Sequence, residues 1–430
     1  MKEHVSAAFS AVALGVALGV YLERFRRKHI FNDDASDPPP TVRNSTDVVK
    51  SGIDVRVDRS ELERSLAVCL ERSGASPPHA SLAAHVLVSA DCRGIPSHGS
   101  NRAEIYSAEL RAGLIDGGAV PKIDRETEST ANVDGRNGLG AVVSRFAMDL
   151  CVKKAKNGGV GLVVCHNSNH FGIAGYWAEM ALREGLIGLS FTNTSPFMVP
   201  TRGRVRAGGT NPIACYCPAG EEDSFQLDMA STTVPVGKVE VCHRKGQRMP
   251  LGWGVDASGT KSSTDPTEVM LQGGLTPLGG MEETAGYKGY GLNMMIEILC
   301  AVLSGCEKVG PDVQPWNISR KLPIDYGHCF LCVDPEKFIP GGGFQEKLAA
   351  YLLCMRNLPT AEAGLSVLVP GDPERQEELL AEANGVRLNE NVALSVRSLA
   401  RELGCDDTLP LEISRLPESK HTVKHLGATH

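Results

Sequence analysis

The sequence of 430 residues lacks the short motifs that mark the common nucleotide-binding and hydrolase folds. It has no G-x-G-x-x-G stretch of the Rossmann fold, no P-loop, no G-x-S-x-G nucleophile elbow and no H-E-x-x-H zinc motif. The short glycine pairs Gly138–Gly140 and Gly159–Gly161 both lack the third glycine. Chemistry must therefore be sought in loops at the ends of helices and strands.

The chain also lacks an excess of positive charge, because 51 acidic residues outnumber 44 lysines and arginines and give a net charge of −7. A protein that binds nucleic acid by neutralising phosphates is more basic, so no nucleic-acid partner is expected. The hydrophobic content of 42 % excludes disorder for the bulk of the chain. The 46 glycines exceed the usual share and indicate tight turns and close backbone contacts, as in α/β ligand-binding proteins.

One long uncharged run is present, in residues 5–22, and basic residues follow it directly. Its length is enough to span a bilayer, and the positive-inside rule would leave the remainder of the chain in the cytoplasm. We expect a transmembrane helix that anchors the protein, the alternative being a cleaved mitochondrial presequence. A proline-rich linker follows, so residues 1–52 are expected to precede the folded body.

In the sequence after residue 52, glycines separate short apolar runs, and this pattern predicts an α/β arrangement. Apolar spacing predicts helices at 60–73, 79–93, 101–112, 172–184, 292–303, 374–383 and 391–403. Buried strands are predicted at 159–165 and 186–191. Because these two strands flank a helix, part of the sheet is expected to be parallel. The segment 292–303 is too short to span a membrane and is expected to lie in the core.

The first candidate site is the segment from Ser97 to Tyr106, which combines a histidine, an arginine and a tyrosine. Arg102 and Tyr106 are four residues apart and share one helix face, with Ser97 and His98 in the loop before it. A guanidinium can bind a substrate carboxylate through two hydrogen bonds, and a histidine can move a proton near neutral pH. The alternative is a capping loop with a surface arginine.

The second candidate is the loop from Asn167 to Gly172, directly after a predicted strand. Ligands bind at the carboxyl ends of strands in α/β proteins, and His170 lies at such a position. The alternative is a polar loop with a hydrogen-bonded histidine. A zinc site made by His166 and His170 is disfavoured, because the residues between them are poor helix formers.

Hydroxyl- and amide-rich turns at 192–196 and 208–212 offer neutral hydrogen bonds, and Lys238 and Lys288 lie in glycine-rich settings from which an amine can reach a phosphate. Each of these strings is also typical of an ordinary solvated loop. Near the C-terminus, Asp372 is interpreted as the N-cap of a helix and Pro373 as its first residue.

Taken in order, these segments resemble the malate/L-lactate dehydrogenase family that lacks a Rossmann domain. The resemblance runs from about Ile53 to Leu403. It is carried by SHGSNRAEIY at 97–106, NSNHFGIAGYWAEMA at 167–181, TNTSP at 192–196, GGTNPIA at 208–214, DMASTTVPVGK at 228–238 and KGYGL at 288–292. Each string alone is weak, and the series of six is specific.

The resemblance implies the non-Rossmann α/β fold of this family, a mixed-sheet nucleotide-binding domain with a helical domain. We expect residues 126–291 to form the NAD(P)-binding domain, and residues 53–125 with 292–412 to form the helical, substrate-binding and dimerisation domain. Residues 413–430 are expected to be a tail. The family is usually a homodimer, so a second copy is the expected protein partner.

The resemblance also implies hydride transfer between NAD or NADP and a 2-hydroxy or 2-oxo acid. It gives His170, with His98 beside it, the catalytic role, and Ser97, Arg102 and Tyr106 the substrate-binding role. It assigns the cofactor to Thr194, Asp228, Met229, Ala230, Lys288, Gly371 and Asp372, and no metal.

Two alternatives stay open at this point. A catalytically silent, membrane-anchored module that binds a nucleotide or a partner would explain the extra N-terminal segment. The choice between NAD and NADP is also open, because no acidic residue that reads the ribose can be located without the Rossmann frame. The particular acid, or a cyclic imine in its place, is not specified by the sequence.

Overall fold

The computed structural model describes residues 54–316, 320–405 and 414–415. All of them belong to one compact unit, Val48–His430. A second unit, Met1–Asp47, lies outside the described residues, as does the predicted membrane segment 5–22.

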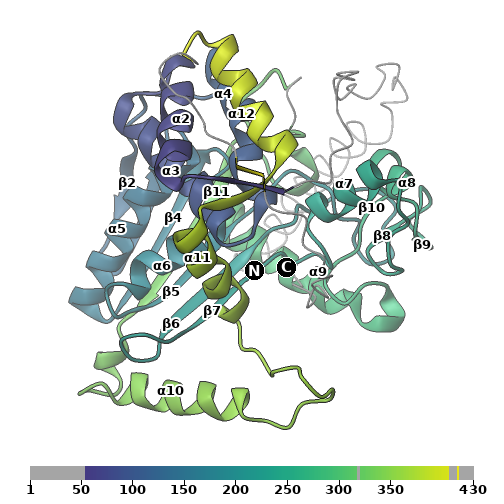
Figure 1. Cartoon of the computed structure of the whole chain (residues 1–430). Helices are drawn as coiled ribbons and strands as arrows, with labels where there is room; N and C mark the ends of the chain where they lie inside the picture. The colour runs from purple at the N-terminus through teal and green to yellow at the C-terminus, as the bar shows by residue number, and fades with distance from the viewer. Residues whose placement is uncertain (1–53, 317–319, 406–413, 416–430) are drawn as a thin grey trace, which may run out of the picture. The chain divides into compact units, whose positions relative to one another are not determined.

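A mixed sheet of seven strands forms the centre of the described chain (Figure 1). In spatial order its strands are β2 (Lys122–Glu126), β3 (Thr130–Asp134), β4 (Val160–Ser168), β11 (Tyr326–Val333), β5 (Ile187–Thr192), β6 (Ile213–Pro218) and β7 (Ser224–Met229). The pair β3 and β4 is parallel, and the other neighbouring pairs are antiparallel. The two predicted strands, β4 and β5, are not neighbours, because β11 lies between them.

Apolar side chains on both faces explain why the central strands are buried. On β4, Val163 and Cys165 join the large core, while Leu162 and Val164 belong to a second cluster, as the two-residue period of a strand requires. Helices α5 (Gly140–Gly158) and α6 (Ala174–Leu182) pack on the strands, as do α9 (Gly286–Glu297) and the π-helical segment η4 (Ile298–Val302). The sheet is therefore covered by helices and leaves its strand ends for a site.

A second, helical layer is joined to a small sheet of three strands in the order β12, β1, β13. Its strands are β1 (Asp54–Val57), β12 (Val386–Asn389) and β13 (Ser414–Arg415). Its helices are α2 (Arg59–Arg72), α3 (Pro77–Cys92), α4 (Ala103–Arg111), α11 (Asp372–Asn384) and α12 (Glu390–Glu402), with the short 3₁₀ turns η1 (Pro96–His98) and η2 (Ser100–Arg102) before α4. Distant parts of the chain thus meet, since β1 pairs with β12.

The remaining elements form smaller clusters. The strands β8 (Gly254–Val255), β9 (Ser262–Ser263) and β10 (Gly274–Leu275) pair beside α7 (Val236–Lys245) and α8 (Pro266–Leu271). Helix α10 (Gly343–Arg356) packs Leu352 against Ala219 and Val369. Short 3₁₀ turns lie at η3 (Glu282–Thr284), η5 (Gly310–Asp312) and η6 (Pro335–Lys337).

The two predicted strands and six of the seven predicted helices are confirmed within a few residues at their ends, whereas the helix predicted at 292–303 covers the second half of α9 and the π-helical segment η4. The predicted domain limits stay a prediction, with one difference in the structure. β11, which the sequence division places with 292–412, is a central strand of the seven-stranded sheet. Its pairing with β4 and β5 is a long-range contact that local periodicity cannot reveal.

The helix predicted at 292–303 is buried on one side only. Ile296 and Cys300 are fully buried, whereas Met294, Ile298 and Val302 are between 47 % and 55 % exposed. The expectation of a core helix therefore applies to its inner face only. Its apolar outer face is available for contact with another molecule.

Candidate active site

The loop that carries Ser97, His98 and Arg102 is fixed to the end of α3 by a buried carboxylate. One oxygen of Asp91 accepts hydrogen bonds from the backbone N–H of Ser100 at 2.8 Å and from its hydroxyl at 2.5 Å. A Cβ on Gly99 would lie 1.8 Å from the other oxygen, so only glycine fits there. Burial raises the pKa of Asp91 to about 7. The Ser100 hydroxyl therefore bonds this carboxylate and does not cap helix α4.

The loop that carries His170 is held by two close backbone contacts. A Cβ on Gly140, at the start of α5, would lie 2.2 Å from the carbonyl oxygen of Asn169. Gly172 has a φ of +82°, and a Cβ there would lie 2.4 Å from Val86. Glycine is therefore required at both positions, and these contacts fix the backbone position of His170 after β4.

The two candidate loops meet at Tyr106 and His170. The Tyr106 hydroxyl oxygen lies 2.7 Å from His170 Nδ1 and 3.2 Å from the His170 carbonyl oxygen. Both contacts are satisfied when Nδ1–H donates to the phenol oxygen and the phenol O–H donates to the carbonyl. The Gly172 N–H also points at Nδ1 from 3.4 Å, the long limit of a hydrogen bond, and this weak contact is lost when Nδ1 carries the hydrogen. In this arrangement Nε2 of His170 carries a lone pair that can accept a proton.

Two further rings, those of Trp316 and His98, lie against this contact. The ring of His170 is stacked on Trp316 with a centroid distance of 4.3 Å and on His98 with a centroid distance of 5.4 Å. The guanidinium of Arg102 lies 5.4 Å from the centre of the Trp316 ring. The sequence segment 97–106 and the loop 167–172 therefore form one cluster.

Burial keeps the histidines of this cluster neutral. It lowers the pKa of His170 well below its usual value, with further contributions from His98 and Arg102. Burial and the nearby charge of Arg102 lower the pKa of His98 to about 3. A neutral imidazole is the form that accepts a proton, so His170 is ready to act as a base.

Arg102 is oriented by its own loop. Its Nε donates to the carbonyl oxygen of Ser97 at 2.6 Å, and the Ser97 hydroxyl lies 2.9 Å from His98 Nδ1. A Cβ on Gly237 would lie 2.9 Å from the Cβ of Ser97, so the start of α7 lies directly against this loop. The predicted substrate residues are thus brought together, next to the chain that follows β7.

The predicted cofactor segments are connected by a chain of backbone contacts. The Thr194 hydroxyl accepts from the Thr210 N–H at 2.8 Å, and the Thr210 carbonyl accepts from the Ser231 N–H at 2.9 Å. The Ser231 carbonyl accepts from the Leu278 N–H at 2.9 Å, and Gly289 packs on the Leu278 backbone. Thr194, the segment after Ala230 and the first turn of α9 with exposed Lys288 therefore lie along one continuous path.

Asp228 and Gly371 join this path at β7. Asp228 accepts from the Gly175 N–H at 2.7 Å, which satisfies a free donor at the start of α6. The Gln226 N–H donates to the Pro370 carbonyl at 3.0 Å, and a Cβ on Gly371 would lie 2.7 Å from the Gln226 side chain. The turn at Gly371 therefore rests on the strand that carries Asp228 and Met229.

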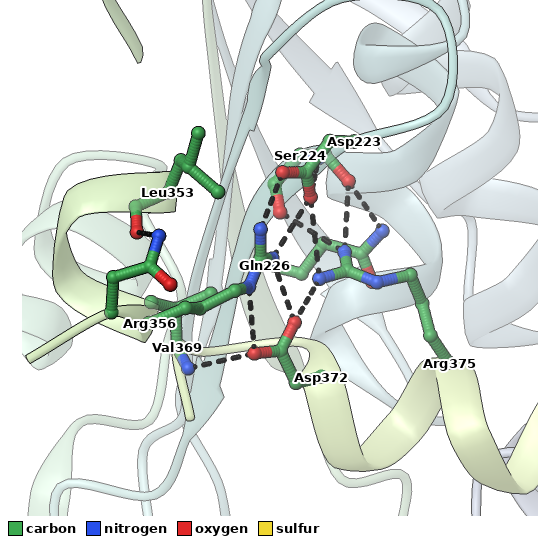
Figure 2. A network of polar contacts seen from close by, with 9 residues as sticks. Asp223, Ser224, Gln226, Leu353, Arg356, Val369, Asp372 and Arg375 are labelled. Carbon is green, nitrogen blue, oxygen red and sulfur yellow. Dashed lines mark hydrogen bonds and ion pairs between the residues drawn. The ribbon is translucent and has the colours of Figure 1, made fainter. Parts of the chain in front are cut away.

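Asp372 lies inside a network of four charges (Figure 2). Its carboxylate accepts from Arg356 at 2.8 and 3.1 Å, from Arg375 at 2.5 Å and from the Val369 N–H at 2.9 Å. Arg356 also binds Asp223 at 2.6 and 3.0 Å. Burial alone would raise the pKa of Asp372, but the hydrogen bonds from Arg356 hold it below its usual value. Asp372 is the first residue of α11 and Gly371 is the cap, one residue earlier than expected.

The chemistry of this surface fits a nicotinamide dinucleotide. It offers hydroxyl, amide and backbone groups and one exposed amine, that of Lys288. The carboxylates of Asp228 and Asp372 accept hydrogen bonds from protein donors, which limits their repulsion of a phosphate. The buried amide oxygen of Gln226 has no hydrogen-bond partner in the protein and can accept one from a ligand.

The zinc alternative receives no support from the geometry of the two histidines. His166 Nε2 lies 3.0 Å from Asp124, whereas His170 contacts Tyr106. Asn167 between them has a φ of +54°, which interrupts any helix. Within residues 54–316, 320–405 and 414–415, no group of three His, Cys, Asp or Glu side chains is placed to bind a metal.

Sequence reasoning missed Trp316, Glu109 and Arg320, which lie at the cluster. Glu109 accepts from the Trp316 indole at 2.9 Å and from Arg320 at 2.5 Å, and both charged side chains are buried. Glu109 follows Tyr106 by three residues on α4, a spacing that could have been noticed. No sequence pattern marks Trp316, which lies in an irregular stretch.

The mixed sheet with its helical layer is an α/β fold without the Rossmann glycine motif. The protein-family model described as malate/L-lactate dehydrogenase matches residues 57–397. The chain is 42 % identical over 300 residues to a malate dehydrogenase of Pyrococcus horikoshii, covering 69 % of this chain and 81 % of that protein. It is 37 % identical over 352 residues to a malate/(S)-sulfolactate dehydrogenase of Methanothermus fervidus, covering 81 % and 98 % of the two chains.

Solved structures agree with the sequence comparison. The structure of malate dehydrogenase from Pyrococcus horikoshii matches with a TM-score of 0.75 and 34 % identity, covering 82 % of this chain and 96 % of that one. The chain therefore belongs to the malate/L-lactate dehydrogenase family. It is an NAD- or NADP-dependent oxidoreductase of hydroxy acids, which confirms the predicted fold and reaction class.

Two expectations are corrected. The comparisons give no support to a catalytically silent membrane module, because the matched proteins are dehydrogenases. The membrane-anchored location and its mitochondrial alternative are also withdrawn. In the part of the chain that the structure describes, no helix has both the length and the hydropathy to cross a bilayer. The segment 5–22, on which that expectation depends, lies outside that part.

Proposed function

We propose that the cluster around His170 oxidises a 2-hydroxy acid to the 2-oxo acid, and catalyses the reverse reduction. The C2–OH proton passes to His170 Nε2 as the C2 hydride leaves, so that the C2–O bond becomes a carbonyl. The bound nicotinamide supplies the chemistry of hydride acceptor and donor. The observation that carries this proposal is the contact of Tyr106 with Nδ1 and the carbonyl of the neutral His170.

Arg102 is proposed to bind the carboxylate of the acid. Its position beside Trp316, which is stacked on His170, places a cation close to the proton acceptor. A 2-hydroxy acid has its carboxylate and its reacting hydroxyl on adjacent carbons, so the two protein groups match the two substrate groups. Ser97 and His98 complete the loop that orients the guanidinium.

The cofactor is proposed to lie along the path that joins Thr194, the segment from Asp228 to Ala230, and Lys288. Hydroxyl and backbone groups suit ribose and amide, while the Lys288 amine suits a phosphate. Gly371 and Asp372 would contact the same molecule where their turn rests on β7.

The test measures NADH and NADPH oxidation by the full chain with oxaloacetate, pyruvate, a sulfonated 2-oxo acid and a cyclic imino acid. We expect turnover with at least one of them and a loss of about 10³-fold in kcat for His170→Asn, with NADH affinity unchanged. His243→Asn, at an exposed histidine on α7, is the matched control. An unchanged rate for His170→Asn would reject the proton-transfer role.

We also propose that two copies of the chain form a dimer through α9 and η4. Met294, Met295, Ile298, Val302 and Leu303 follow helical spacing and are between 42 % and 55 % exposed. Such a contiguous apolar helix face costs free energy in water unless it is covered. The proposal is for a homodimer, as expected from the family resemblance.

Light scattering after size-exclusion chromatography tests the dimer. We expect twice the chain mass of 45.9 kDa for the wild type and a single chain mass for Ile298→Glu/Val302→Glu. Leu251→Glu, at a leucine that is 72 % exposed elsewhere, should remain dimeric. A wild-type mass of one chain at micromolar concentration contradicts the proposal.

A further inference from the structure

Trp316 contacts both His170, the proposed proton acceptor, and Arg102, the proposed carboxylate-binding residue. Its ring is stacked on His170 with planes 16° apart, and the Arg102 guanidinium lies above it. A flat ring at 4.3 Å leaves little room for the imidazole to rotate about its bond to Cβ. The tryptophan therefore restricts the direction of Nε2.

The indole itself is held in place by a buried ion pair. Its N–H donates to Glu109 Oε1 at 2.9 Å, and the same oxygen accepts from Arg320 at 2.5 Å. The side chains of Arg320 and Glu109 are 1 % and 3 % exposed. Charges buried this deeply lose their hydration and keep their geometry only when each hydrogen bond is made, so the position of the indole is closely defined.

Helix α4 links this support to the reactive histidine. Tyr106 and Glu109 are three residues apart and therefore share one helix face. Tyr106 fixes Nδ1 of His170, and Glu109 fixes the ring that lies on the same imidazole. One rigid helix thus determines both the rotation and the stacking of His170.

We propose that Trp316, fixed by the Glu109–Arg320 pair, is a positioning residue that aligns His170 for proton transfer. This inference rests on the proposed function, since it assigns the proton to His170. It adds a residue that the family resemblance did not single out. An imidazole that is already held in the reactive orientation lowers the activation free energy of proton transfer. Displacement of the His170 ring should therefore slow the chemical step and leave cofactor binding unchanged.

The charged and titratable groups that face His170 come from four elements. They are Tyr106 of α4, His98 of η1, Arg102 of η2 and His328 of β11. Trp316 adds an apolar surface that keeps water from the ring. Its removal should therefore admit water and bring the pKa of His170 closer to the usual value.

The experiment compares Trp316→Leu with Trp316→Phe in the full chain, using Trp253→Leu as the matched control for loss of a tryptophan. For Trp316→Leu we expect a fall of about 30-fold in kcat for hydroxy-acid oxidation and a twofold or smaller change in NADH dissociation constant. Trp316→Phe keeps a stacking ring and should retain kcat within about threefold. The acid limb of the kcat/KM profile should move to higher pH for Trp316→Leu only.

Assays run well below the melting temperature of each variant, measured by scanning calorimetry. A Trp316→Leu enzyme with wild-type kcat and an unmoved acid limb overturns the inference. Equal losses in Trp316→Leu, Trp316→Phe and Trp253→Leu also overturn it, because they indicate a structural role alone. If His170→Asn keeps its activity, the proposed function itself fails, and the two failures are thereby distinguished.

Discussion

The proposed substrate cluster and the proposed cofactor surface are held by opposite means. Around His170 the contacts are buried, the histidines are neutral and glycines set the backbone path. Around Asp372 the contacts are ion pairs between half-buried side chains, with two carboxylates and two guanidiniums (Figure 2). Proton transfer requires an exact direction, whereas a charged cofactor requires a surface of balanced charge.

This difference predicts how each region responds to change. A buried, neutral cluster should be sensitive to lost geometry and to added protons. A half-buried ion-pair network should tolerate single substitutions, because water and the remaining partners replace what is lost. The following three predictions test this contrast.

The largest effect is expected at the guanidinium of the substrate cluster. Arg102→Ala should raise the KM for the 2-oxo acid by about 100-fold, because a charge-assisted pair of hydrogen bonds to the carboxylate is lost. Arg102→Lys should recover only part of this affinity, since an ammonium lacks the planar fork. Steady-state kinetics with saturating NADH measures both. An unchanged KM in Arg102→Ala would place the carboxylate elsewhere.

As the pH is lowered, the packing around His170 should lose stability before the ion-pair network of Asp372 does. Burial lowers the pKa of the fully buried His328 to about 3. Below about pH 6.5, this histidine is therefore protonated in the unfolded chain and stays neutral in the folded chain. The contribution of His328 to the free energy of unfolding is therefore greatest above pH 6.5, and it falls as the pH is lowered towards 3. At pH 5 the loss is about 2 kcal/mol. Asp372 loses its contribution only below its usual carboxyl range, because its pKa is lowered.

Urea unfolding of wild type and His328→Gln between pH 7 and 4.5 measures this effect. The comparison with the variant is needed because Asp91, whose pKa is raised to about 7, acts in the opposite direction. Its stability is greatest at low pH and is lost as the pH rises through 7. The His328→Gln protein should show a flatter loss on acidification, and identical slopes would contradict the assignment.

The smallest effect is expected at Asp372. Asp372→Asn should change the free energy of unfolding by about 1 kcal/mol or less, because Asp223 still pairs with Arg356. The network becomes one unit more positive, so the ratio of kcat/KM for NADPH to that for NADH should rise several-fold and respond to salt. Asp149→Asn, in the exposed pair with Arg145, is the control. An unchanged ratio would mean that this network does not face the cofactor.

The local elements of the fold could be predicted because their signals are local. β4 and α6 follow from an apolar run and from helical spacing, and both lie close to the expected bounds. The contact between Tyr106 and His170 joins two segments that the sequence analysis had singled out separately. Composition and spacing alone did not pair them, and the family resemblance supplied that link.

Other features depend on contacts between distant parts of the chain. Asp372 is separated by 149 positions from Asp223, and Arg356 binds both, so its helix-capping pattern concealed an ion pair. Trp316 could not be recognised, because its neighbours Glu109 and His170 lie more than 140 residues away. Such groups become visible only when the long-range packing is known.

The place of β11 in the sheet has a consequence for the order in which the protein is made. During synthesis, β4 and β5 leave the ribosome long before β11 (residues 326–333). Until β11 emerges, the edge of each strand that pairs with β11 has no hydrogen-bond partner. Unpaired apolar edges invite association with other chains. Chains that terminate before Tyr326 should therefore aggregate, and the seven-stranded sheet cannot be completed in a separate fragment that ends at residue 291.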